Sequence, residues 1–216
     1  MKLKFENQAF QLDAIASTVN LFNGMQSLAL SEQLANQNEI LSYDLVANGL
    51  QLNELQLLKN LQSIQLLDSL ENYATELYYG EYAFKRKDDA GNEIEPLIKI
   101  PNVSIEMETG TGKTYVYLRT AFELNKRYSL TKFIIVVPSD AIRAGVLKSL
   151  EITKEHFKSE YNNVSYDYYQ YDSEKISKVR DFATTNSIQI MVMTIAAFNK
   201  DKNNIYAFKD KFGEYR

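Results

Sequence analysis

The segment Glu108–Thr114, with the sequence ETGTGKT, contains residue types that can bind a phosphate group. Glycines at positions 110 and 112 lack a Cβ atom, so the backbone can turn tightly and present successive N–H groups to an anion. The helical pattern that follows adds the partial positive charge of a helix N-terminus. In such a loop, Lys113 would reach the β- and γ-phosphates and the Thr114 hydroxyl would bind Mg²⁺. The sequence therefore predicts a site for ATP and Mg²⁺ at Thr109, Gly110, Thr111, Gly112, Lys113 and Thr114.

The residues before the loop support this prediction. Val103–Met107 is a short, mostly apolar run that is typical of a buried strand. The loop would then lie between a strand and a helix, as a phosphate-binding motif requires. One departure is Met107, which stands where the motif normally has a glycine. The alternative is an ordinary glycine turn that opens a helix, and the combination of strand, turn and helix favours the phosphate site.

Hydrolysis of ATP also needs an acidic residue that holds Mg²⁺ at the end of a second buried strand. The sequence has no Asp-Glu dipeptide. Asp140 follows Pro138 and Ser139, which place it beyond the strand end, whereas Asp167 and Asp172 lie in a polar segment that we expect at the surface. We therefore predict no complete catalytic set in this chain.

Composition limits the other kinds of chemistry. The 216 residues are 45% hydrophobic and contain no cysteine, which allows a folded core and excludes disulfides and thiolate metal sites. The single histidine, His156, has no evident partners for a triad or a zinc site, so we expect it on a helix surface. The net charge of −4 gives no global attraction to DNA, although a local groove needs only a few donors.

The sequence shows neither the pattern of a signal peptide nor that of a membrane span. The N-terminal residues 1–10 lack the apolar core of a signal peptide. No uncharged apolar run is long enough to span a bilayer. We expect a cytoplasmic protein with no membrane partner.

The N-terminal half should be mostly helical. Apolar spacing predicts a helix over residues 8–22, with Asn7 as its N-cap and Gly24 as its stop. Leucines that recur from position 55 predict one long amphipathic helix that ends at Gly80. We read this leucine pattern as core packing rather than as a partner-binding zipper.

A β-hairpin should follow this helix. Its two arms flank the turn-rich residues 88–92, and Pro96 suggests that the second arm is an edge strand. The basic run Lys85–Lys87 lies in the first arm. A solvated turn is the more common explanation of such a run, and a nucleic-acid contact is the alternative.

The C-terminal half alternates strands and helices, which indicates an α/β fold with a mostly parallel sheet covered on both faces. Ligands in such sheets bind beyond the carboxyl ends of the strands. The expected strands are KFIIVVP at 132–138, VSYDYYQY at 164–171 and IQIMVMT at 188–194. The expected helices cover residues 141–150, 152–161, 174–184 and 195–198.

Three segments in this order, FQLDAI, ETGTGKTYVYLRT and FIIVVPSDAIRAGVLKSL, resemble the N-terminal part of the Res subunit of type III restriction–modification enzymes. The later segments YDS and IMVMTIAAFNKDKNN are similar to that family as well. The resemblance implies a RecA-like P-loop motor lobe of the superfamily 2 helicase type, in which the first position of the loop varies.

The resemblance also implies roles for single residues. Gln11 is similar to the glutamine that reads the adenine edge, with Phe5 packing on the base. Ser139, Arg143 and Thr194 fall at positions that contact the phosphates of a DNA strand. Plain helix N-capping explains Ser139 and Thr194 equally well.

The same resemblance suggests a division of the chain. Residues 1–26 would carry the adenine-recognition helix, residues 27–100 a helical and β-hairpin insertion, and residues 101–216 the first ATP-binding lobe. In the family, the chain continues with the acidic motif, a second motor lobe and a nuclease domain, so we expect a lobe and sheet that are incomplete at the C-terminal end, before the acidic motif.

Three functions remain open at this stage. The first is an ATP-binding, DNA-contacting motor segment of a type III restriction enzyme, which would act with DNA and with a modification (methyltransferase) subunit. The second is a nucleotide-binding module without independent hydrolysis. The third is an unrelated phosphate-loop enzyme such as a small-molecule kinase, in which VVPSDAIRAGV has no obvious role.

Overall fold

The computed structural model describes residues 5–26, 48–67, 73–83, 86–87, 92–95, 97–172 and 175–198. Its elements in chain order are α1 (Ala9–Asn20), α3 (Glu54–Leu67), β1 (Tyr78–Ala83), β2 (Arg86–Lys87), β3 (Glu93–Ile94), β4 (Leu97–Asn102), α4 (Lys113–Tyr128), β5 (Lys132–Val137), α5 (Asp140–Glu160), β6 (Tyr166–Gln170), α6 (Ile176–Thr184), β7 (Ile188–Thr194) and α7 (Ile195–Phe198).

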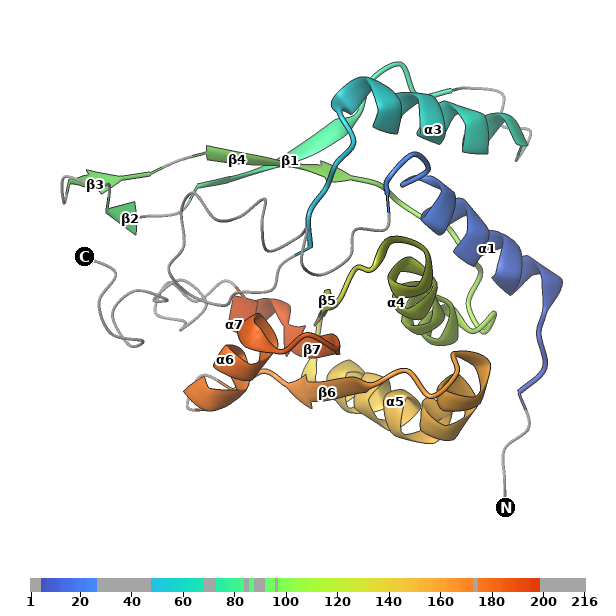
Figure 1. Ribbon diagram of the computed structural model, residues 1–216, viewed down its shortest axis with the longest axis vertical. Helices are drawn as coiled ribbons and strands as arrows, with labels where there is room; N and C mark the ends of the chain where they lie inside the picture. The colour runs from blue at the N-terminus through green and yellow to red at the C-terminus, as the bar shows by residue number, and fades with distance from the viewer. Residues whose placement is uncertain are drawn as a thin grey trace.

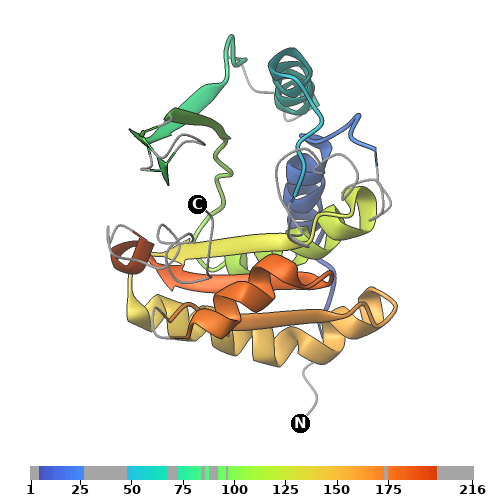
Figure 2. The ribbon, with the colours of Figure 1, turned by 60° about the vertical axis from the view of Figure 1, so that its left-hand side comes forward.

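A parallel sheet with the strand order β5-β7-β6 forms the centre of the C-terminal half (Figure 2). Alternate residues of β7 point to opposite faces of the sheet. Ile190 and Val192 pack into a cluster with α4 and α5, whereas Met191 and Met193 pack against a cluster that includes α6. The predicted α/β architecture, with helices on both faces of a parallel sheet, is confirmed.

Helices α1 and α4 lie side by side and run in the same direction (Figure 1). Ile15 and Val19 of α1 share a buried cluster with Val116, Leu124 and Tyr128 of α4, and α3 adds a further side to it. At the C-terminal ends of the two helices, the Tyr128 hydroxyl donates a hydrogen bond to the Val19 carbonyl at 3.2 Å. The expected first helix is therefore present, and Gly24 ends the turn after it with a positive φ of 97°.

The β-hairpin is also confirmed. Strands β1 and β4 pair antiparallel from Tyr78 opposite Asn102 to Ala83 opposite Leu97, and β2 pairs with β3 toward the tip. Figure 1 shows the hairpin reaching away from the helices. Of the basic run, the backbone of residues 86–87 forms β2, whereas Lys85 and Pro96 lie outside the described residues.

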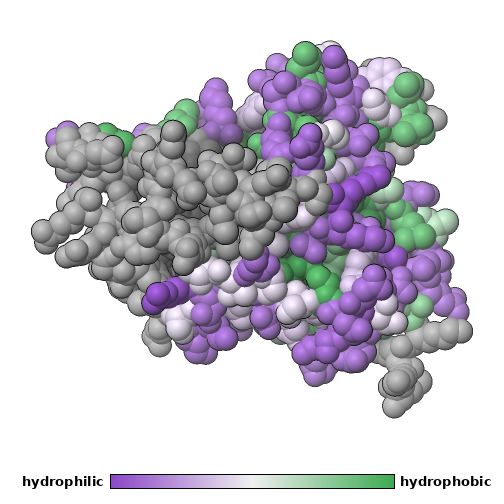
Figure 3. All heavy atoms as spheres, viewed as in Figure 1, coloured by the Kyte–Doolittle hydropathy of each residue, from purple (hydrophilic) through white to green (hydrophobic). Residues whose placement is uncertain are grey.

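The helix predicted to run as far as Gly80 is wrong in its extent. The helix α3 ends at Leu67, and Tyr78–Ala83 is a strand. Aromatic pairs favour strands, and β1 gains its backbone hydrogen bonds from β4, a partner that the leucine spacing does not reveal. Exposed leucines such as Leu67 remain on α3, and Figure 3 shows hydrophobic residues scattered among hydrophilic ones over this part of the surface.

The strand predicted at Val103–Met107 is also wrong. These residues have no strand conformation, and the side chains of Val103 and Ile105 are exposed. The alternating pattern is typical of a strand, but a strand also needs a neighbour to satisfy its backbone groups. Within the described residues, β5 is paired only with β7, so no ladder includes this segment.

Two smaller differences concern helix α5 and helix α4. The residues expected to form two helices form the single helix α5, which Ser139 caps at its N-terminus. In α4, Ala121, Leu124 and Tyr128 are buried as expected, but Tyr117 is partly exposed. Among the described residues, no helix has the length and apolar character needed to cross a membrane.

Candidate nucleotide-binding site

The glycine-rich loop leads directly into α4. Gly110 and Gly112 have φ values of 85° and 84°, a left-handed conformation that favours glycine. The Thr111 hydroxyl donates a hydrogen bond to the Glu108 carbonyl at 2.7 Å, which closes the turn. Gly112 stands at the N-cap of α4, so the amides of the first turn point into the loop. The loop therefore has the conformation that an anion-binding helix N-terminus needs, without the strand expected before it.

Gln11 is brought onto this loop from a position about 100 residues earlier in the chain. Its side-chain amide donates a hydrogen bond from Nε2 to the Thr111 carbonyl at 2.9 Å. A Cβ atom placed on Gly112 would lie 2.5 Å from the same Nε2 atom. The backbone conformation therefore favours glycine at position 112, and a larger residue there would also displace the Gln11 side-chain amide.

The remaining loop residues lie where a nucleotide could reach them. Thr109 and Lys113 are exposed, and Lys113 is the first residue of α4. Burial raises the pKa of the Tyr117 hydroxyl, and a side-chain hydrogen bond with Thr114 acts in the opposite direction. The Thr114 side chain therefore lies beside Tyr117, on the first turn of the helix.

The donor set fits a magnesium ion that arrives with nucleotide phosphates. Within the described part of the chain, no three His, Cys, Asp or Glu side chains gather closely enough to hold a metal ion. Mg²⁺ keeps several waters and takes only one or two protein ligands when phosphates supply the rest. The Thr114 hydroxyl would be one such ligand.

The residues expected to contact DNA lie at the carboxyl end of the sheet. Ser139 follows β5, and its hydroxyl accepts a hydrogen bond from the Ile142 amide at 3.4 Å. Thr194 ends β7 opposite Val137 and accepts a hydrogen bond from the Ala197 amide at 3.2 Å, which caps α7. Both residues therefore do serve as helix caps. Arg143 forms an ion pair with the exposed Asp140 at 3.0 Å.

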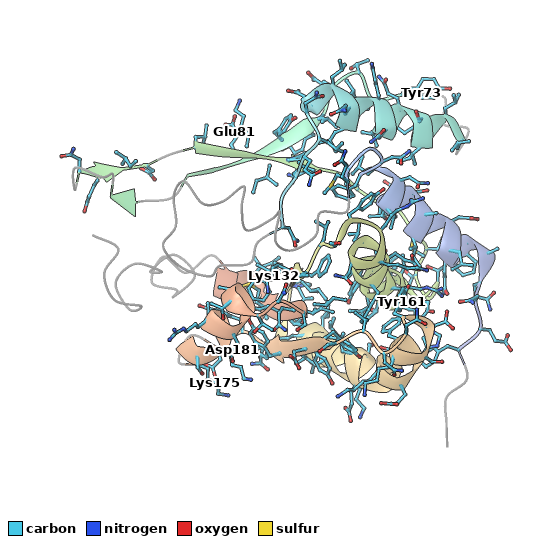
Figure 4. The ribbon with its side chains drawn as sticks, in the orientation of Figure 1. Tyr73, Glu81, Lys132, Tyr161, Lys175 and Asp181 are labelled. Atoms are coloured by element: carbon cyan, nitrogen blue, oxygen red, sulfur yellow. The ribbon has the colours of Figure 1, made fainter. Side chains whose placement is uncertain are left out.

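A buried arginine network was missed by the sequence analysis. Arg119 of α4 is only 7% exposed. Its guanidinium donates to the Tyr115 hydroxyl at 2.9 Å, to the Tyr161 hydroxyl at 3.3 Å and to Asn7 Oδ1 at 2.5 Å. It also forms an ion pair with Glu160 at 3.4 Å. Tyr161, labelled in Figure 4, in turn donates to Glu123 at 2.7 Å.

Two predictions are corrected by this network. Asn7 is not the N-cap of α1, because its side chain is bound to Arg119. The cap position is Gln8, which makes no side-chain cap hydrogen bond. His156 is not a plain surface residue, since it is partly buried and its Nε2 atom shares a hydrogen bond with the Tyr115 hydroxyl at 2.8 Å. Burial lowers the pKa of His156, and Glu160 acts in the opposite direction.

The aromatic ring of Phe5 lies beside this network. It stacks on His156 with 4.7 Å between centroids and lies parallel to Tyr115 at 6.0 Å. The ring is thus held against the protein by its neighbours, and the packing of Phe5 on a base stays a prediction. The signal that could have revealed the network is Arg119 itself, a charged residue among the apolar positions of α4.

Comparison with known proteins adds the decisive observation. The family model described as "Type III restriction enzyme, res subunit" matches residues 55–214. The chain belongs to this family. The resemblance to this family is thereby confirmed. The matched residues include the whole of the glycine-rich loop, whereas the segment FQLDAI, with Gln11, lies before them.

Individual relatives give the same result. The type III restriction-modification enzyme EcoPI Res subunit of Escherichia phage P1 is 35% identical over 130 residues, which cover 59% of this chain and 11% of that protein. The EcoP15I Res subunit of Escherichia coli is 49% identical over 61 residues, 27% of this chain and 6% of that protein. The StyLTI Res subunit of Salmonella typhimurium is 42% identical over 82 residues, 35% of this chain and 8% of that protein. The chain thus matches about a tenth or less of the length of these relatives.

Proposed function

We propose that this chain binds ATP with Mg²⁺ as the first RecA-like lobe of a type III restriction motor. In this proposal the loop Thr109–Thr114 holds the phosphates, Lys113 contacts the β- and γ-phosphates, Thr114 binds Mg²⁺ and Gln11 reads the adenine edge. The observation that carries the proposal is the hydrogen bond from Gln11 to Thr111, which joins the proposed base reader to the proposed phosphate cradle.

The same proposal assigns a DNA-facing role to the carboxyl end of the sheet. Ser139 and Arg143 follow β5, and Thr194 ends β7, so these residues gather at one edge. Small hydroxyl side chains, free amides at helix starts and an arginine are suited to the phosphates of a DNA strand rather than to its bases. The motor would act on DNA together with a modification (methyltransferase) subunit, because the relatives are Res subunits of type III restriction-modification enzymes.

The parts of the chain would divide this work. Residues 1–26 would recognise adenine, residues 27–100 would form an insertion, and residues 101–216 would form the ATP-binding lobe. No residue of the chain is assigned to the bond-breaking step of hydrolysis or to DNA cleavage.

The test is nucleotide binding by the 216-residue chain and by Lys113→Ala, measured by isothermal titration with ADP and Mg²⁺. Loss of a charge-assisted contact to phosphate should weaken binding by about 10- to 100-fold. Lys126→Ala is the matched control, because Lys126 is an exposed lysine at the other end of α4. Equal affinity of Lys113→Ala and Lys126→Ala would overturn the assignment of the loop.

A further inference from the structure

Two polar links attach the start of α1 to α4. One is the hydrogen bond from Gln11 to the carbonyl of Thr111, just before α4. The other is the hydrogen bond from Arg119, about two turns into α4, to Asn7. Asn7 and Gln11 are four residues apart, so the short segment between them is held at both ends against the same helix.

The first turn of α1 depends on these links. The cap residue Gln8 makes no side-chain cap hydrogen bond, and the first turn contains no acidic residue. An uncapped helix end has unsatisfied amides and frays readily. The links to α4 therefore add to the apolar packing of α1 in fixing the position of Gln11, which lies within that turn.

Arg119 is a rigid anchor for this purpose. Its guanidinium is buried and is oriented by Tyr115, Tyr161 and Glu160, which come from α4 itself and from α5 and its C-terminal end. The Phe5 ring, stacked on His156, adds a second attachment two residues before Asn7. The segment before α1 is thus attached to a surface made by α4 and α5 together.

We propose that Arg119 and Asn7 are positioning residues that hold Gln11 against the glycine-rich loop and thereby set the selectivity for adenine. This inference rests on the proposed function, because it requires that Gln11 reads the base. In this proposal the guanidinium acts through Asn7 and not through contact with the nucleotide. Its contribution is to keep the Gln11 amide where an adenine edge, but not a guanine edge, is matched.

The experiment compares the affinities of the 216-residue chain for ADP, GDP and inorganic tripolyphosphate, each with Mg²⁺. Asn7→Ala and Arg119→Lys should lower the preference for ADP over GDP by roughly three- to tenfold, the effect of one mispositioned hydrogen bond. Their affinity for tripolyphosphate should not change, because the loop is intact. Asn7 is exposed on an extended segment, so Asn7→Ala tests the proposal even if Arg119→Lys does not fold.

Asn20→Ala is the matched control. Asn20 accepts a hydrogen bond from Arg127 at 2.7 Å, an arginine–asparagine link between the same two helices at the opposite end from the loop. This variant should keep the full preference for ADP. A merely structural role for Asn7 would make Asn7→Ala behave like Asn20→Ala, and that result would overturn the proposal.

If the unmodified chain binds neither ADP nor tripolyphosphate, the proposed function fails, and this inference fails with it. If it binds both without preferring ADP to GDP, the phosphate site stands and only the positioning role of Arg119 and Asn7 is overturned.

Discussion

Strands β5 and β7 look alike in the sequence but have different surroundings in the fold. All residues of β7 are buried, because this strand has a neighbour on each side and helices on each face. In β5, Ile134 and Val136 are 45% and 43% exposed, although both belong to an apolar run of the same kind. Helices α6 and α7 pack over the face of the sheet that carries Met191 and Met193 of β7. On the same face, Ile134 and Val136 of β5 stay largely exposed. An apolar run therefore predicts a strand, but not how completely that strand is buried.

The largest effect should come from truncating the two strands at matched isoleucines. Ile190 of β7 is fully buried, so Ile190→Ala should lower the free energy of unfolding by about 2–5 kcal/mol through lost contacts and a cavity. Ile134→Ala in β5 should cost about 1 kcal/mol or less, because much of that side chain is already in water. Urea unfolding of both variants measures the difference. Equal losses would mean that β5 is as enclosed as β7 in solution.

Lys132, at the start of β5, should make the free energy of unfolding depend on pH. Lys132, labelled in Figure 4, donates a hydrogen bond from its amino group to the Thr185 carbonyl and lies over the Phe182 ring. Burial lowers the pKa of Lys132 to about 8, from an ordinary value of 10.5. Between these values the unfolded chain binds more protons than the folded one, so this residue should make stability rise with pH from about 8 to 10.5.

The measurement is the free energy of unfolding across that pH range, compared with Lys132→Met. The methionine variant keeps an unbranched apolar side chain and removes the titrating group, so its curve should lack the rise. Parallel curves for the two proteins would contradict the assignment of a half-buried lysine to β5.

The smallest effect should come from the third strand, β6. The Tyr169 hydroxyl is buried and has no hydrogen-bond partner among the described residues. Burial raises its pKa, and the negative charge of Asp181 adds to the shift. Tyr169→Phe should leave stability unchanged or raise it by up to about 1 kcal/mol, because an unsatisfied buried hydroxyl is removed.

Tyr161→Phe provides the contrast for this prediction. Its hydroxyl is bound to both Glu123 and Arg119, so its removal should cost about 1–2 kcal/mol. The pair is measured by thermal unfolding. A loss of stability in Tyr169→Phe as large as that in Tyr161→Phe would show that the Tyr169 hydroxyl is bonded in solution.

The sequence predicted the local elements better than it predicted which strands pair with one another. The strands β5, β6 and β7, the hairpin and the loop follow from apolar patterns and turn residues near each other in the chain. The failed strand at Val103–Met107 has the correct alternation, but strand formation depends on a partner that alternation cannot supply.

The candidate site shows the same division. The loop residues could be identified from their own types and spacing. Gln11 was assigned through the resemblance, and its contact with Thr111 depends on the packing of α1 on α4. Arg119 stands out as a charged residue in α4, but its partners could not be predicted, because Asn7 and Tyr161 lie far from it in the chain and meet it only in the fold.

The proposed nucleotide site can be tested by a two-dimensional NMR titration of the isotope-labelled chain with Mg²⁺ and either ADP or tripolyphosphate. Both ligands should shift the backbone amides of Gly110–Thr114. ADP should shift the side-chain amide of Gln11 further than tripolyphosphate does, because both ligands disturb the loop that this amide contacts at Thr111 but only ADP carries a base. If neither the loop amides nor the Gln11 side-chain amide shifts at saturating ADP, the proposed nucleotide site is wrong.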